Sequence, residues 1–225
     1  MKNNILIIAA HPDDEILGVG GTILKHIKNG DQVSILILGD GESSREGATV
    51  ANIKKRKKQI ERVAKMLKVA NILIDELPDN QFDSLSLLKI AKKVEAIINK
   101  IRPNIVYTHH AYDLNIDHRL TFQAVLTACR PQPDFFVKKI LTFEILSSTE
   151  WQMKDGNNMF CPNEYNNVEN FMDKKIEVLQ IYKDELRESS HPRSIEGVKI
   201  LAQYRGMEVG YKYAEAFQII RNLND

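Results

Sequence analysis

The residues at 10–15, with the sequence AHPDDE, combine one imidazole with three carboxylates. His11 and Asp14 offer a nitrogen and an oxygen ligand, a set that suits zinc and similar divalent ions. Asp13 lies between them and is free for another task. Acidic residues and proline are also common at the start of a helix, where they act as caps. Capping accounts for Pro12 and one carboxylate, but it leaves the histidine and the other acids unexplained.

A second cluster of polar residues spans 109–119, with the sequence HHAYDLNIDHR. His118 is the natural third metal ligand in this cluster. Asp117 precedes it and is a candidate for the carboxylate that fixes the orientation of an imidazole. We interpret His109 and His110 as core or surface histidines rather than as ligands.

Each cluster follows a short apolar run, at 5–10 and at 104–108, that is typical of a buried strand. Each is followed by a segment with helical character, at 16–27 and at 120–129. Ligands of α/β sheets bind beyond the carboxyl ends of the strands. The two clusters are therefore expected to meet at one edge of a sheet and to form a metal site there.

The wider pattern alternates apolar strand segments with amphipathic helical segments, which predicts βαβ units and a mainly parallel sheet. Strands are predicted at 4–10, 33–39, 71–75, 104–109, 138–146 and 214–220, and helices at 16–29, 50–68, 86–101, 118–129, 167–186 and 194–210. Residues 151–166 are polar and are predicted to form a loop. Gly18, Gly20 and Gly21 lack the third glycine of a dinucleotide fingerprint, so we assign them to close helix–sheet packing rather than to NAD binding.

The two clusters together resemble the LmbE-like family of zinc-dependent deacetylases, which includes PIG-L, the de-N-acetylase of GPI-anchor biosynthesis. AHPDDE at 10–15 and DLNIDHRLT at 113–121 carry the resemblance, and GDGE at 39–42 and HPRS at 191–194 extend it. It implies an α/β, Rossmann-like three-layer fold with a mainly parallel sheet flanked by helices. The chain would be one domain over 1–225, in which about 151–212 form a C-terminal loop and helical cap.

The resemblance also implies an activity, the hydrolysis of the acetyl group from an N-acetylated amino-sugar conjugate. His11, Asp14 and His118 would bind Zn²⁺, or another divalent ion such as Fe²⁺, and Asp13 would be the general base. Asn115 stands where several members have a histidine, so the general acid is open. Protonated Asp13 or His191 would then supply the proton to the leaving amine.

Arg56 lies on the apolar stripe of its predicted helix, where a guanidinium needs an anionic partner or an outlet to water. The resemblance favours contact with substrate or a carboxylate at the site. Asn115 and Asp117 are assigned to substrate binding or to support of the metal ligands. Two other function classes stay open, namely a two-metal phosphoesterase that also uses His109, His110, Asp113 and Asp117, and a non-catalytic carbohydrate-binding protein.

Composition excludes several partners. The formal net charge of +1 argues against broad attraction to nucleic acid or an anionic membrane. No apolar stretch approaches the length of a membrane span, and the first apolar run is too short for a secretory signal. Two cysteines are consistent with a reducing cytoplasm. We therefore expect a cytoplasmic protein with a small-molecule substrate, and a homo-oligomer is left open.

Overall fold

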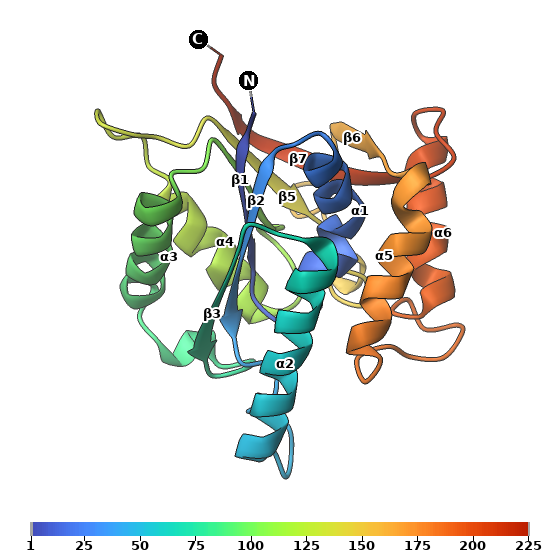
Figure 1. Cartoon of the computed structure of the whole chain (residues 1–225), viewed down its shortest axis with the longest axis horizontal. Coiled ribbons are helices and arrows are strands. Elements are labelled where there is room, and N and C mark those ends of the chain that lie inside the picture. The colour runs from blue at the N-terminus through green and yellow to red at the C-terminus, as the bar shows by residue number, and fades with distance from the viewer. Residues whose placement is uncertain (1, 225) are drawn as a thin grey trace.

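The apolar segments rich in isoleucine and leucine form the centre of a seven-stranded sheet, as the computed structural model of residues 2–224 shows (Figure 1). Its strand order is β3-β2-β1-β4-β5-β7-β6. The strands are β1 (Asn4–Ala9), β2 (Gln32–Gly39), β3 (Asn71–Leu77), β4 (Ile105–His109), β5 (Lys139–Phe143), β6 (Glu164–Asn167) and β7 (Ala214–Asn222). The strands β1 to β5 are parallel, and β7 runs antiparallel to both of its neighbours. The predicted α/β class with a mainly parallel sheet is confirmed.

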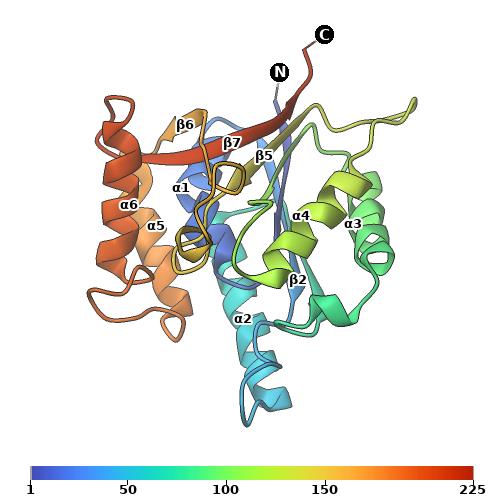
Figure 2. The same ribbon diagram turned by 180° about the vertical axis from the view of Figure 1, so that it is seen from behind.

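Helices cover both faces of this sheet (Figures 1 and 2). On one face lie α3 and α4, and on the other lie α1 and α2 with α5 and α6 beyond them. The helices are α1 (Asp14–Lys28), α2 (Val50–Leu67), α3 (Leu87–Ile101), α4 (Ile116–Ala128), α5 (Met172–Leu179) and α6 (Ile195–Met207). Two buried apolar clusters fill the space on either side of β1 and β4. Across residues 2–224, no helix is long and apolar enough to cross a membrane.

The glycines of α1 allow the close packing that the sequence predicted. A Cβ atom on Gly18 would lie 2.4 Å from Cδ2 of Phe143, and one on Gly21 would lie 2.8 Å from Val168 side-chain atoms. These separations are shorter than van der Waals contact, so only glycine fits under the neighbouring side chains. The close approach holds α1 against the sheet and fixes where its first turn, with Asp14, lies.

The chain after β5 departs from the prediction. The helix predicted at 167–186 is the shorter α5 (Met172–Leu179) between single turns of 3₁₀ helix, and the strand predicted at 138–146 ends at Phe143. An unpredicted strand, β6, pairs with β7 at the edge of the sheet. Its four residues, Glu164–Asn167, are polar and half-buried, so they lack the apolar alternation that identifies a strand.

Candidate active site

The carboxyl ends of β1 and β4 bring the two polar clusters together. The strands are parallel neighbours, with Ile5 opposite Ile105 and Ile7 opposite Tyr107. The chain that leaves β1 contributes His11 and Asp14, and α4 contributes His118 from its first turn. Both strand ends therefore place their side chains at the same edge of the sheet, as predicted.

Three ligand atoms form a nearly equilateral triangle at this edge. His11 Nδ1 lies 3.4 Å from Asp14 Oδ2, His118 Nε2 lies 3.3 Å from the same oxygen, and the two nitrogens are 3.3 Å apart. A tetrahedron with metal–ligand bonds of about 2.0–2.1 Å has edges of about 3.3–3.4 Å. The donor types and their spacing thus fit one face of a tetrahedral zinc site, which leaves the fourth position for another ligand.

The outer nitrogen of each histidine faces a buried carboxylate. Asp117 Oδ2 lies 2.9 Å from His11 Nε2, and Asp113 Oδ1 lies 3.1 Å from His118 Nδ1. A carboxylate can only accept a hydrogen bond, so it favours a proton on the outer nitrogen and leaves the inner lone pair for a metal. Asp113 is itself held by the hydroxyl groups of Ser148 and Thr149, the latter at 2.5 Å.

The close contacts between imidazoles and carboxylates shift the pKa values of the triangle residues. Burial alone would lower the pKa of His118, but the carboxylates of Asp14 and Asp113 outweigh it and raise this pKa to about 9. Burial would raise the pKa of Asp14, but the surrounding imidazoles hold it well below its usual range. Burial would also lower the pKa of His11, but Asp117 and Asp14 raise it well above its usual range, so both imidazoles bind protons that an incoming metal must displace. Metal affinity at this site is therefore expected to rise with pH.

Asp13 has a backbone conformation that side chains seldom adopt. Its φ is +119°, and although it occupies the position before α1 its carboxylate caps no backbone N–H. Such a conformation costs about 1–3 kcal/mol and is common at functional sites. The carboxylate instead accepts a hydrogen bond from Arg193 Nη1 at 3.3 Å. Burial raises the pKa of Asp13 to about 7 although the Arg193 guanidinium opposes the shift.

Glu15 holds the backbone of Asp13 in place through a hydrogen bond. Its Oε2 accepts a hydrogen bond from the backbone N–H of Asp13 at 3.0 Å, and its Oε1 accepts one from the Tyr182 hydroxyl at 2.8 Å. Burial raises the pKa of Glu15 to about 8 against the effect of the Tyr182 hydrogen bond. The third acid of the first cluster is thus an anchor for the backbone of Asp13 rather than a member of the metal triangle.

Arg56 lies within an ion-pair network next to the cavity. Its buried guanidinium donates to Glu42 Oε1 from Nε at 3.0 Å and also contacts Glu185. Arg45 also contacts Glu185, at the same carboxylate oxygen as Arg56. The predicted contact with carboxylates is present, but Arg56 does not line the cavity, whereas Arg45 and Glu185 do.

His191 lies in a turn before α6 rather than in the cavity lining. Its Nδ1 accepts a hydrogen bond from the backbone N–H of Arg193 at 3.0 Å, and its ring packs edge-on against Trp151. The same HPRS segment sends Arg193 into the cavity instead. The turn therefore places Arg193, the third residue of this motif, next to Asp13.

His109 and Asn115 have structural partners. His109 Nε2 accepts a hydrogen bond from the backbone N–H of Ala10 at 2.8 Å, so this lone pair is not free for a metal. Asn115 caps α4 through Asp117 N and also lines the cavity. Asp113 accepts hydrogen bonds from two hydroxyl groups, and His110 Nε2 lies 3.1 Å from the carbonyl oxygen of Asn158, so these two residues also have protein partners. One further grouping, His11 with Asp79 and Asp117, shares His11 with the triangle.

The cavity above the triangle has a volume of about 150 Å³. It is lined almost entirely by polar side chains, among them His11, Asp13, Asp14, Ser44, Arg45, Asp79, Asn80, Asn115, His118, Glu185 and Arg193. Its size and polarity fit a small hydrophilic group. Sequence reasoning missed Asp79, Glu185 and Arg45, because they come from loops and carry no spacing signal of their own.

Comparison with known proteins shows a family match for this chain. Residues 6–129, just over half of the chain, match PIG-L, the family described as GlcNAc-PI de-N-acetylase. A diacetylchitobiose deacetylase of Thermococcus kodakarensis is 25% identical over 96% of this chain and 82% of its own length. A probable N-acetyl-α-D-glucosaminyl L-malate deacetylase 2 of Bacillus anthracis is 24% identical over 81% of this chain and 82% of its own.

Solved structures share the fold across the whole chain. The conserved protein TT1542 of Thermus thermophilus superposes with a TM-score of 0.79 at 22% identity, covering 99% of this chain and 97% of its own. GalB, a 4-carboxy-2-hydroxymuconate hydratase from Pseudomonas putida, superposes with a TM-score of 0.76 at 18% identity, covering 100% of this chain and 98% of its own. The fold therefore also occurs in a protein named for a different reaction, and function must be argued from the site.

Proposed function

Because the chain belongs to the PIG-L family, we propose that it is a metal-dependent hydrolase that removes the acetyl group from an N-acetylated amino-sugar conjugate. The observation that carries the proposal is the triangle of His11 Nδ1, Asp14 Oδ2 and His118 Nε2, with edges of 3.3–3.4 Å. Both matched relatives are named as deacetylases of N-acetylated sugars, which supports the substrate class. Zn²⁺, or another divalent ion such as Fe²⁺, would be held by these three residues.

The chemistry that a divalent ion supplies in such a site is Lewis acidity, which lowers the pKa of water and stabilises developing negative charge. Asp13 would act as the general base. Its carboxylate lines the cavity beside Asp14 without belonging to the triangle, and Arg193 orients it. After the water proton has moved to Asp13, the same group can return it to the leaving amine.

The source of that last proton has a second candidate. His191 stays a prediction as the general acid, and its test is the pH–rate profile of a His191 variant. Arg193 brings a positive charge to the cavity and would keep the carboxylate of Asp13 directed toward it. Asn115 can bind substrate through its amide. Arg56 and Asp117 do not line the cavity and would support it through their contacts with Glu185 and His11.

We also infer the finer features of the fold. The order β3-β2-β1-β4-β5 with helices on both faces supports a Rossmann-like three-layer arrangement. A single domain with 151–212 as loop and helical cap is supported by β7, which follows this segment and pairs with β5. Arg193 and Glu185 come from the same segment and line the cavity, so the cap would help to complete the site.

The test is a screen of the metal-loaded protein against N-acetylated amino-sugar conjugates, with loss of the acetyl group followed by mass spectrometry and release of acetate measured separately. His11→Ala and His118→Ala should each lose both the metal and the activity. Full metal content in both variants would contradict the ligand assignment. Hydrolysis of phosphate esters with all acetamido sugars left intact would contradict the proposed reaction.

A further inference from the structure

A second hollow of the surface lies beside the catalytic cavity, along α2. This groove has a volume of about 670 Å³ and runs between α2 and residues 180–183. Its lining comprises Ala51, Lys54, Lys55, Lys58, Gln59, Arg62, Gln180, Ile181 and Lys183. Gln59 Nε2 donates to the carbonyl oxygen of Ile181 at 2.8 Å and so joins the two walls. We call it the α2 groove.

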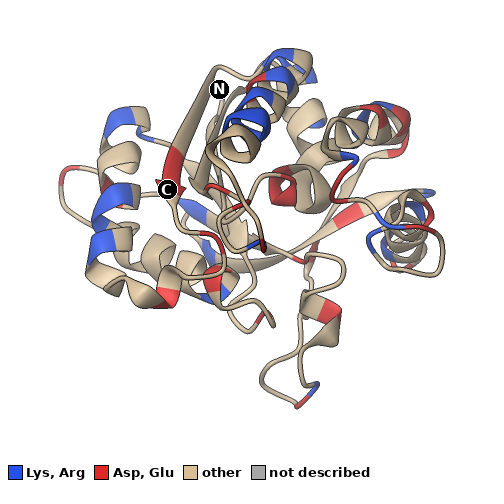
Figure 3. Cartoon of the chain, turned by 90° about the horizontal axis from the view of Figure 1, so that it is seen from below, with Lys and Arg blue, Asp and Glu red and all other residues tan. Residues whose placement is uncertain are grey.

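The α2 groove is strongly cationic in a protein whose net charge is only +1. Five of its lining residues are Lys or Arg, all exposed, and none of the described residues that line it is acidic. Figure 3 shows the positions of Lys and Arg along the ribbon in blue. Lys55 pairs with Asp184 at 2.6 Å. No carboxylate within residues 2–224 forms an ion pair with Lys54, Lys58, Arg62 or Lys183. The charge of these four side chains is therefore available to a ligand.

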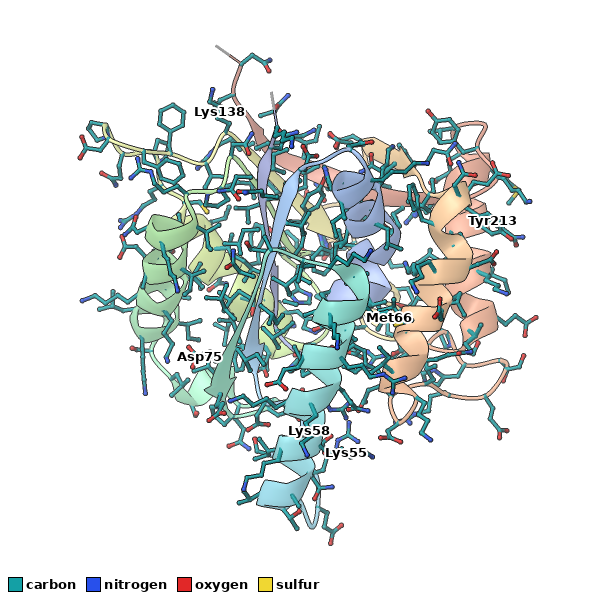
Figure 4. The ribbon with its side chains drawn as sticks, in the orientation of Figure 1. Lys55, Lys58, Met66, Asp75, Lys138 and Tyr213 are labelled. Atoms are coloured by element: carbon teal, nitrogen blue, oxygen red, sulfur yellow. The ribbon has the colours of Figure 1, made fainter. Side chains whose placement is uncertain are left out.

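The arrangement of these cations is unfavourable for the helix itself. Lys54, Lys58 and Arg62 recur every fourth residue, so they stand above one another on one face of α2, about 6 Å apart along the helix axis. Like charges at this spacing destabilise a helix. In Figure 4, Lys55 and Lys58 are labelled on the half of α2 that extends past the sheet. An anion in the groove would relieve this repulsion.

The α2 groove and the catalytic cavity share a wall. Two consecutive residues of α2 pair with two consecutive residues of the segment after α5, Lys55 with Asp184 and Arg56 with Glu185. Glu185 faces the cavity and Lys55 faces the groove. The groove and the cavity therefore lie on opposite sides of one layer of side chains, and a substrate that extends over the outside of this layer would contact both.

We propose that the α2 groove binds an anionic group, a phosphate or a carboxylate, carried by the part of the substrate that is not deacetylated. This inference rests on the proposed function and adds that the amino sugar is attached to a charged carrier. The groove contains no aromatic side chain, so it offers no platform for stacking a base or a sugar ring. It offers charge, two amide side chains and the apolar contact of Ala51 and Ile181, which suits an anion on a flexible linker.

The test uses two substrates that differ only in one phosphate, the N-acetylglucosaminides of glycerol and of glycerol 3-phosphate. The α2 variant is Lys54→Gln, Lys58→Gln and Arg62→Gln combined. The matched control carries Lys89→Gln, Lys92→Gln and Lys100→Gln, which remove three exposed charges from α3 on the opposite face of the sheet. Metal-loaded protein is used throughout.

We expect a lower KM for the phosphate substrate than for the neutral one. The α2 variant should raise KM for the phosphate substrate by about tenfold, the combined effect of three exposed charge contacts, and leave its kcat unchanged. Added salt should have the same effect on the wild type, because it screens exposed charges. The α3 control should retain the wild-type preference.

Several results would overturn the inference. An equal rise of KM in both triple variants, or an unchanged KM in the α2 variant, would show that the groove does not bind the phosphate. Reduced sedimentation of the α2 variant with vesicles of phosphatidylcholine and phosphatidylglycerol, at unchanged KM, would assign the groove to a bilayer instead. If neither glycoside is deacetylated, calorimetric binding of the phosphate glycoside to wild type and α2 variant still decides the inference, while the proposed function fails separately.

Discussion

The substitution Asp117→Asn should change which nitrogen of His11 carries the proton. In the structure Asp117 Oδ1 accepts from the backbone N–H of Phe82 at 3.0 Å, and Oδ2 lies 2.9 Å from His11 Nε2. An asparagine has one acceptor oxygen and one donor nitrogen for these two places. If its oxygen keeps the Phe82 N–H, its NH₂ group faces His11 Nε2. His11 Nε2 must then accept a hydrogen bond from this NH₂ group, so the ring proton moves to Nδ1. Nδ1 belongs to the triangle, and its lone pair is then no longer available to a metal.

The expected loss of metal affinity follows from the known effect of removing a carboxylate that is hydrogen-bonded to a metal-binding histidine. Loss of such a partner lowers metal affinity by about 10–100-fold, which corresponds to about 1.4–2.8 kcal/mol. The opposite orientation of the asparagine is also unfavourable. Its oxygen would accept from His11 Nε2, but its NH₂ group would then face the Phe82 N–H, and two donors cannot form a hydrogen bond. A buried donor without an acceptor costs about 1–3 kcal/mol. Both orientations therefore weaken the site by a similar amount.

The assay is zinc affinity by competition with a chelating dye at constant pH, together with the ¹⁵N chemical shifts of the His11 ring in the metal-free protein. The shifts are recorded at a pH above the raised pKa of His11, where the ring is neutral and carries one proton. Asp79→Asn is the matched control, because Asp79 Oδ1 also lies near His11 Nε2, at 3.4 Å, and the same charge is removed. We expect the large loss of affinity and the shifted proton only in Asp117→Asn. Wild-type affinity in that variant would refute the role given to Asp117.

The other predictions concern catalysis and packing. Asp13→Asn should retain zinc by elemental analysis but lower turnover by about 10²–10⁴. At saturating zinc, the decline of wild-type activity as pH falls through the pKa of this base should vanish in the variant. If His191 is the general acid, His191→Ala flattens the alkaline limb of the pH–rate profile, whereas a wild-type bell assigns that proton to Asp13. Gly18→Ala should lower the free energy of unfolding, measured by urea denaturation, by about 1–3 kcal/mol, because its Cβ would lie 2.4 Å from Phe143. Gly156→Ala is the control and should have little effect, because no heavy atom lies within 4 Å of its Cβ.

The parts of the fold and site that the sequence predicted depend on local pattern. The runs that became β1 and β4 are continuously apolar, and the metal-competent residues follow them directly, so their meeting at one sheet edge could be expected. β6 could not be found in this way, since it pairs at the edge of the sheet with β7, which lies far along the chain. Glu185 gave no signal either, because its importance comes from Arg45 and Arg56, which reach it only after folding.

The position of the metal triangle in the chain has a consequence for folding thermodynamics. His11 and His118 are 107 residues apart, and only the pairing of β1 with β4 brings them within 3.3 Å. An unfolded chain has no such arrangement, so an ion at this site binds the native state alone. By mass action, free ion at about 100 times its dissociation constant would add about 2.7 kcal/mol to the free energy of unfolding. Melting temperature in the presence and absence of a chelator thus reports occupancy of the site without any knowledge of the substrate.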